Sequence, residues 1–271
     1  MIRLYLILLT SALCPPAQAA VGWGDVPVWD DGLAEVAIYN ATRSAYGKTR
    51  SYETILITVK EDLNADTYTK ADFPYEGKRL LPVLKLNIVS EVVTENYPYR
   101  YLTSVFVDRS DVLRLHKLTT ASQEWCGNTF KMVQTWGGPP KILYHSYWED
   151  QSDGSYLLDT SENRLLEDQL PVSLRSLPFK AGYRRDIRLV RSLISNRAPV
   201  PQVIEAVMEV QKLESLTVAA GNYRAWPVRI TGEGVSLTLW FQSEPPNILL
   251  KSESDNGRSL KLQQTERRKY W

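Results

Sequence analysis

The sequence predicts a mainly β protein: one large curled antiparallel sheet, a half-open barrel, with one short helical segment near residues 161–177. Three observations support this fold class. Most of the chain alternates apolar and polar residues in runs rich in Val, Ile, Leu, Thr and Tyr, which is the pattern of half-buried strands. Short turn sequences separate these runs. Only one interval has the helical period.

The alternating runs predict about thirteen strands. Turn-forming sequences lie between them, including Tyr46-Gly47-Lys48-Thr49, Gly137-Gly138-Pro139-Pro140 and Asn256-Gly257. Asn-Gly between two strand patterns favours a hairpin, because both residues accept a positive φ. The predicted strands are 33–46, 52–61, 83–93, 99–107, 113–124, 129–136, 142–148, 187–194, 203–213, 223–231, 235–241, 248–253 and 259–265.

The interval 161–177 has a different period. Leu166, Leu170, Leu174 and Leu177 recur at spacings of four, four and three, which favours a helix. Ser161 can cap its start, and Pro171 is expected to divide it into two short pieces. We interpret the leucine stripe as a face that packs against the sheet.

So many short-connected strands must cover one sheet face and protect the sheet edges. A sheet that curls over the 161–177 helix meets both needs. We therefore expect a single β-rich domain over residues 20–271, with the helix between two strand-rich halves.

The first nineteen residues have the features of a signal peptide. Arg3 precedes an apolar run over residues 4–13, and Ala17-Gln18-Ala19 forms a small-x-small cleavage site. We expect an exported protein of the periplasm or the extracellular space. Lipid anchoring at Cys14 is disfavoured, because the bulky Leu13 precedes it.

The balance of charge argues against nucleic acid and anionic lipid as partners. Without Arg3 the chain has 31 basic and 31 acidic residues, so the expected mature protein is neutral. A neutral chain lacks the basic excess of nucleic-acid-binding proteins and of proteins that dock on anionic lipid. No apolar run after residue 19 reaches the roughly 18–20 residues of a transmembrane helix.

Five stretches together resemble a family of uncharacterised secreted bacterial proteins. They are residues 29–35 (Trp-Asp-Asp-Gly-Leu-Ala-Glu), 46–48 (Tyr-Gly-Lys), 85–87 (Lys-Leu-Asn), 122–127 (Ser-Gln-Glu-Trp-Cys-Gly) and 221–226 (Gly-Asn-Tyr-Arg-Ala-Trp). The chain is similar in these stretches to the DUF3108 group. The resemblance implies a curved antiparallel sheet or half barrel in the cell envelope. Some members carry the label "septum formation inhibitor Maf", but the cytoplasmic α/β fold of Maf proteins does not fit alternating strands.

Cys126 is the sharpest catalytic candidate. Trp125-Cys126-Gly127 is similar to the start of a thioredoxin redox site, but Thr129 stands where the second cysteine would be. A cysteine nucleophile with a histidine base stays open, with His116 and His145 as the two histidines of the chain. The alternative interpretation makes Cys126 a small buried hydrophobe, with Trp125 as core or groove packing.

Neither a metal site nor a glycosidase pair has its characteristic residue spacing in this chain. Zinc sites need three or four closely spaced ligands, and this chain offers two isolated histidines and one mature cysteine, so we expect no metal and no cofactor. Carboxylates are plentiful, but nothing in their spacing predicts a glycosidase pair, and we interpret them as solvated charges. They are Asp30, Asp31, Glu35, Glu124, Glu149, Glu167 and Asp168.

The aromatic content favours a ligand groove. Eight tryptophans and fifteen tyrosines can line the concave side of a curled sheet. The candidate ligand-binding residues are Trp136, Tyr144, Tyr147, Trp148, Trp226 and Trp240. The leading hypothesis is non-catalytic binding of an apolar or amphipathic envelope molecule, or of an envelope protein, in this concavity. The alternative is a thiol-dependent enzyme that uses Cys126.

Overall fold

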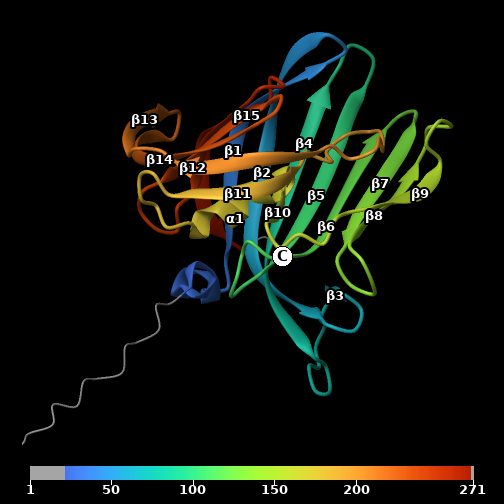
Figure 1. Ribbon diagram of the computed structural model, residues 1–271, viewed down its shortest axis with the longest axis horizontal. Helices are drawn as coiled ribbons and strands as arrows, with labels where there is room; N and C mark the ends of the chain where they lie inside the picture. Colours follow the sequence, from blue (N-terminus) through green and yellow to red (C-terminus); the bar gives the residue numbers. More distant parts are fainter. Residues whose placement is uncertain (1–21, 270–271) are drawn as a thin grey trace, which may run out of the picture.

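The structure is a computed structural model that describes residues 22–269 (Figure 1). The predicted signal peptide and Cys14 lie outside the described residues. Within this part of the chain, no helix is long and apolar enough to cross a membrane. The fold is mainly β, as predicted: one large mixed sheet that curls without closing.

The chain forms two groups of strands on either side of a short helical stretch. The first group follows two 3-10 turns, η1 (Trp23–Asp25) and η2 (Pro27–Asp30). It consists of β1 (Ala34–Ala45), β2 (Lys48–Asn64), β3 (Thr69–Lys70), β4 (Leu80–Val93), β5 (Pro98–Asp108), β6 (Leu115–Glu124), β7 (Gly127–Gln134), β8 (Lys141–Ser146) and β9 (Asp153–Leu157).

The second group begins with β10 (Arg164–Leu166), after which the helical stretch intervenes. It continues with β11 (Arg184–Val190), β12 (Val203–Val210), β13 (Glu214–Val218), β14 (Gly221–Gly232), β15 (Val235–Gln242), β16 (Leu249–Ser254) and β17 (Ser259–Arg268). All thirteen predicted strands are present. The prediction omitted the short strands β3, β9, β10 and β13.

The first strand joins the two groups. β1 pairs with β2 on one side and with the last strand, β17, on the other. From β2 the sheet continues through β4 to β9, and from β17 it continues back through β16, β15, β14 and β12 to β11 and β10. Among the strands of residues 22–269, only β10 and β11 pair in parallel. Within the described sheet, this path of pairings ends at β9 and β10, and the short strands β3 and β13 each pair with a single neighbour, β2 and β14.

The turn predictions are confirmed. Tyr46 and Gly47 connect β1 to β2 with φ of 53° and 70°, and Gly257 turns between β16 and β17 with φ of 76°. Two successive positive φ values match the right-handed twist of the flanking strands. Glycine adopts them without steric cost.

The predicted helix over 161–177 is shorter than expected. Residues 164–166 extend as β10, and the helical part consists of η3 (Glu167–Gln169), α1 (Leu170–Ser173) and η4 (Leu174–Ser176). Pro171 lies in the first turn of α1 rather than dividing a longer helix. Proline is accepted there because the first-turn N–H has no partner within the helix.

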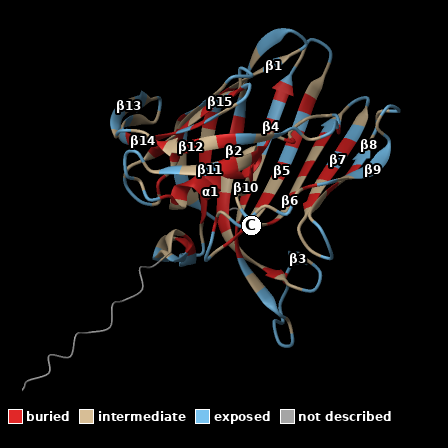
Figure 2. Ribbon diagram, in the orientation of Figure 1, coloured by how far each residue is buried: buried red, intermediate tan, exposed pale blue. Residues whose placement is uncertain are grey.

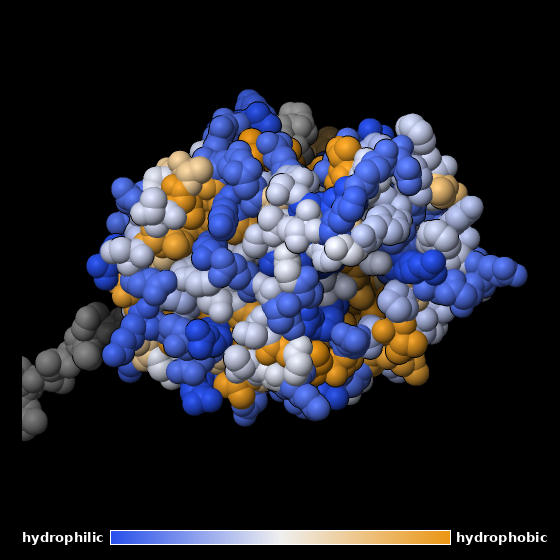
Figure 3. Space-filling view, turned by 90° about the horizontal axis from the view of Figure 1, so that it is seen from above, coloured by the Kyte–Doolittle hydropathy of each residue, from blue (hydrophilic) through white to orange (hydrophobic). Residues whose placement is uncertain are grey.

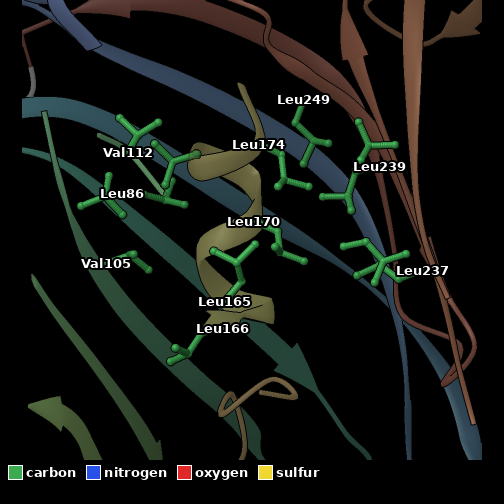
Figure 4. Packing of buried hydrophobic residues seen from close by; sticks show 14 of the residues in the cluster. Leu86, Val105, Val112, Leu165, Leu166, Leu170, Leu174, Leu237, Leu239 and Leu249 are labelled. Carbon is green, nitrogen blue, oxygen red and sulfur yellow. The ribbon is translucent and has the colours of Figure 1, made fainter. Parts of the chain in front are cut away.

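The leucine stripe nevertheless packs as predicted. Leu166, Leu170 and Leu174 are buried in the main core. The helical stretch lies between Leu86 and Val105 on one side and Leu237, Leu239 and Leu249 on the other (Figure 4). Buried and exposed residues alternate along the strands around it (Figure 2). The inner face of the sheet is therefore filled at its centre by the chain itself.

Candidate functional site

An irregular segment crosses the inner face beside the helical stretch. We call residues 191–202, between β11 and β12, the crossing segment. Lys131 Nζ donates to the carbonyls of Ser195 (2.9 Å) and Arg197 (2.6 Å). Asn196 O accepts from Thr129 Oγ1 and from Trp148 Nε1, both at 2.8 Å. Polar side chains of β7 and of the loop after β8 thus hold the crossing segment over the sheet.

Cavities remain around this segment. The inner cavity, of about 110 Å³, lies between β1, β2 and β4, the helical stretch and β15–β17. Its wall is mostly apolar, with charged and hydroxyl groups at one side. Its lining includes Arg43, Tyr52, Leu56, Ile88, Glu167, Asp168, Leu237, Leu239, Arg258 and Leu260.

Two arginines line the inner cavity without an acidic partner. Arg43 and Arg258 form no ion pair within the described chain, and Arg43 Nε is buried without a hydrogen-bond partner. The Arg43 guanidinium lies 4.9 Å from the centre of the Tyr101 ring. Burial, and second the neighbouring Arg258, lower the pKa of Arg43. The structure therefore keeps two like charges together at some cost in stability.

The carboxylates of the inner cavity have other partners. Glu167 forms an ion pair with Arg191 at 2.7 Å, and Asp168 Oδ2 accepts the amide N–H of Leu193 at 2.7 Å. Arg258 donates to Ser192 Oγ and, at 2.7 Å, to Ile194 O. The interpretation of Glu35, Glu167 and Asp168 as solvated charges is corrected here. Asp168 and Glu35 are buried, and Glu167 is sequestered sufficiently for burial to raise its pKa.

A second cavity opens at the rim of the sheet. This rim cavity, of about 350 Å³, shares Arg43 with the inner cavity. Its walls are aromatic on the β5 side and polar on the side of the crossing segment. It is lined by Arg43, Ser44, Ala45, Tyr46, Val92, Tyr99, Tyr101, Trp148, Asn196 and Arg197.

A chain of hydroxyl groups leads outward from the rim cavity. The Tyr46 and Tyr99 hydroxyls are hydrogen-bonded, Tyr99 donates to Tyr97 at 3.3 Å, and the Tyr97 hydroxyl lies 3.0 Å from Cys126 Sγ. Burial is the main cause that raises the pKa of Tyr99, and the Tyr46 hydrogen bond adds to it. The Tyr99 hydroxyl therefore stays neutral at physiological pH.

A third cavity lies on the other side of the crossing segment. This side cavity, of about 130 Å³, is lined by Lys131, Tyr144 and Tyr156 among others. The two tyrosine rings stack with their centres 4.8 Å apart. Burial lowers the pKa of Lys131 to about 8.

Cys126 lies in the turn between β6 and β7 and is exposed, so the interpretation of a buried Cys126 is wrong. The neighbouring Trp125 is 77% exposed and stacks on Tyr97, with ring centres 5.8 Å apart. This aromatic pair forms part of the surface rather than the core.

The structure does not bring Cys126 and the two histidines together. His116 is buried near the start of β6, eight strand residues from Glu124, or about 26 Å. Its Nε2 lies 3.0 Å from Asp108 Oδ2. Burial raises the pKa of Asp108, but hydrogen bonds from Ser110, Arg114 and His116 outweigh it and hold that pKa well below 3.8.

His145 lies on the opposite face. It is exposed on β8, with Nδ1 3.4 Å from Asp153 Oδ1. Cys126 has Tyr97, not a histidine, as its polar side-chain contact. In the described residues, no three His, Cys, Asp or Glu side chains cluster in a way that could hold a metal ion.

The six aromatic candidates are spread over the molecule. Tyr144 lines the side cavity and Trp148 lines the rim cavity, where Arg197 lies 4.1 Å from the centre of its ring. Trp226 is on the inner face of β14 and stacks on Phe179. These three residues face inward, but they do not share one groove.

The other three candidates lie elsewhere. Trp136 stacks on Tyr68 with ring centres 4.1 Å apart, near the start of β6 where His116 lies. Tyr147 is exposed. Trp240 alternates with the inward Leu239 and Phe241, and its Nε1 donates to Glu214 Oε1 at 2.7 Å. None of these three lines the inner, rim or side cavity.

Sequence reasoning missed Arg43, Arg258 and Tyr52. Arg43 follows Tyr39 and Ala41 on the inward side of β1, and that alternation is visible in the sequence. Which face of the strand is inward depends on the partner strands, however. Seen from above, apolar side chains form separate patches between hydrophilic ones (Figure 3), so this view shows no single apolar face.

Comparisons of the chain with protein-family models, with curated proteins and with solved structures give no match.

Proposed function

We propose that this protein is an exported, non-catalytic binding protein that holds an amphipathic molecule of the cell envelope inside its curled sheet. The observation that carries the proposal is the pair of cavities that meet at Arg43. The inner cavity has an apolar wall and the rim cavity has an aromatic one. Ligand sites of binding proteins combine such apolar walls with a few polar groups.

The separation of Cys126 from both histidines favours binding over thiol catalysis. A cysteine nucleophile needs a base within hydrogen-bond reach, roughly 2.6–3.2 Å, or a nearby positive field. Cys126 contacts a tyrosine hydroxyl instead.

Native mass spectrometry of gently purified protein tests the proposal directly. We expect a co-purifying amphipathic molecule, or uptake of the uncharged fluorophore N-phenyl-1-naphthylamine with a rise in its emission. A protein that carries no ligand and takes up no fluorophore would contradict the proposal.

A substitution at the rim locates the site. Ala45 is a small residue that lines the rim cavity at the end of β1. Ala45→Trp should fill the cavity and reduce fluorophore uptake, whereas Ala45→Ser should leave uptake unchanged. Equal uptake by both variants would place the bound fluorophore elsewhere.

A further inference from the structure

Arg43 and Arg258, the two arginines that line the inner cavity, indicate the chemical class of the ligand. Thr42 of β1 pairs with Ser259, the first residue of β17, so Arg43 on β1 adjoins Arg258, the turn residue just before β17. Both side chains line the inner cavity. Like charges at neighbouring cross-strand positions destabilise a sheet unless something compensates them.

Arg258 is partly compensated, since it donates to Ser192 Oγ and Ile194 O and its charge opposes the burial that raises the pKa of Glu167. Arg43, by contrast, keeps a buried Nε without a hydrogen-bond partner. Glu167, which lines the same cavity, is paired with Arg191, and Arg191 also pairs with Asp255 at 3.1 Å. Asp168 accepts the Leu193 amide. Tyr52, also in the lining, has its pKa raised mainly by burial and is a neutral hydroxyl.

We infer that Arg43 and Arg258 bind the carboxylate of an alkyl-chain ligand at the point where the inner and rim cavities meet. This inference rests on the proposed function and names its ligand class. Guanidinium groups present planar forks of N–H donors that match a carboxylate. The apolar chain would contact Leu56, Ile88 and Leu260.

The carboxylates already present favour a single negative charge on the ligand. Asp168 lines the inner cavity together with the arginines. A phosphate dianion would place two charges near this buried carboxylate, where charges are weakly screened. A carboxylate neutralises the arginine pair with less repulsion.

Isothermal titration of the full chain with octanoate, octanol and octyl phosphate tests this inference. We expect octanoate to bind at least about tenfold more tightly than octanol, a difference of about 1.4 kcal/mol. Arg43→Gln and Arg258→Gln should each reduce octanoate binding and so remove this preference over octanol. Arg100→Gln, on an exposed arginine that pairs with Glu91, is the matched control and should behave as the wild type.

The outcomes separate the two proposals. Equal binding of octanol and octanoate by the wild type would overturn the carboxylate site alone. Tighter binding of octyl phosphate would overturn the choice of headgroup. Failure of all three ligands to bind would remove the proposed function as well.

Thermal unfolding of the ligand-free variants distinguishes a binding role from a structural one. Arg43→Gln removes one of two like charges, so its melting temperature should equal or exceed that of the wild type. A clear fall in the melting temperature of this variant would show that Arg43 stabilises the fold, and it would contradict the inference.

Discussion

Glu35 and Arg175 form the most deeply buried ion pair described in the sheet interior. Their side chains are 6% and 2% exposed, and two N–H···O bonds of 2.8 Å join them. Arg175 Nε also donates to Pro246 O at 2.9 Å, and its guanidinium lies 4.8 Å from the centre of the Trp23 ring. The pair therefore ties β1, η4 and the loop before β16 together.

Removing one partner leaves an unpaired buried charge. We expect Glu35→Gln to lower the free energy of unfolding by about 3–5 kcal/mol, measured by urea denaturation. Glu91→Gln, which breaks the exposed pair with Arg100, should cost about 0–1 kcal/mol. Similar losses in the two variants would contradict this account of the buried pair.

The exposure of the Cys126 thiol predicts that it reacts in the native protein. Cys126 is exposed and lines none of the inner, rim and side cavities. We expect iodoacetamide to alkylate it in the native protein, and the alkylated protein to take up the fluorophore as before. Mass spectrometry and fluorescence titration measure the two results. Alkylation that needs denaturant, or that abolishes uptake, would show that the thiol belongs to the interior or to the site.

At the scale of elements, the crossing segment decides how the concavity is used. The sequence predicts a strand over residues 187–194, but β11 ends at Val190 and the chain then crosses the inner face. Within the crossing segment, Arg191 and Arg197 form ion pairs with Glu167 and Asp150. The crossing segment turns one open concavity into separate cavities.

Lys131 makes the stability of this element depend on pH. Its folded-state pKa of about 8 lies below the ordinary 10.5, so the unfolded chain binds more protons between these pH values. Stability from this group therefore rises as the pH increases from 8 to 10.5. Relative to Lys131→Met, the wild type should gain unfolding free energy across that range in urea titrations.

The control is Lys212→Met, at an exposed lysine, which should show no such pH-dependent difference from the wild type. A flat difference between wild type and Lys131→Met would show that the Lys131 amine is not desolvated.

At the scale of the molecule, β1 makes one sheet of two groups of strands. It pairs with β2, the next strand of the chain, and with β17, which lies more than 200 residues later in the sequence. Tyr39 on β1 also donates its hydroxyl to Leu249 O at 2.7 Å. Core residues from both groups pack in one cluster around the helical stretch.

This connectivity predicts a single unfolding transition. Amide protons of β5 and of β14 should lose protection at the same denaturant concentration in native-state hydrogen exchange. Tyr39→Phe should lower the free energy of unfolding measured at β5 and at β14 by about 0.5–1.5 kcal/mol. The substitution removes a hydrogen bond that joins the two groups of strands. Separate transitions would show two independently folding halves instead.

The strands could be predicted because the alternation of residues along each strand is a local property of the chain. Val235, Leu237, Leu239 and Phe241 alternate with Ser236, Thr238 and Trp240 whatever the partners of β15 are. The turn preferences of Tyr46-Gly47 and Asn256-Gly257 are equally local. The helix prediction was too long because the leucine spacing does not register the pairing of residues 164–166 with β11. Short strands such as β3 and β13 have too few residues to show a period.

By itself, the sequence determined the strand content, the hairpin turns and the leucine stripe, because hydrophobic period and backbone preference act over a few residues. Only the tertiary structure decided which face of each strand is inward, that residues 191–202 cross the concavity, and that Arg43 meets Arg258 there. Those features depend on contacts between strands far apart in the chain, such as β1 with β17, and no local pattern encodes such a contact.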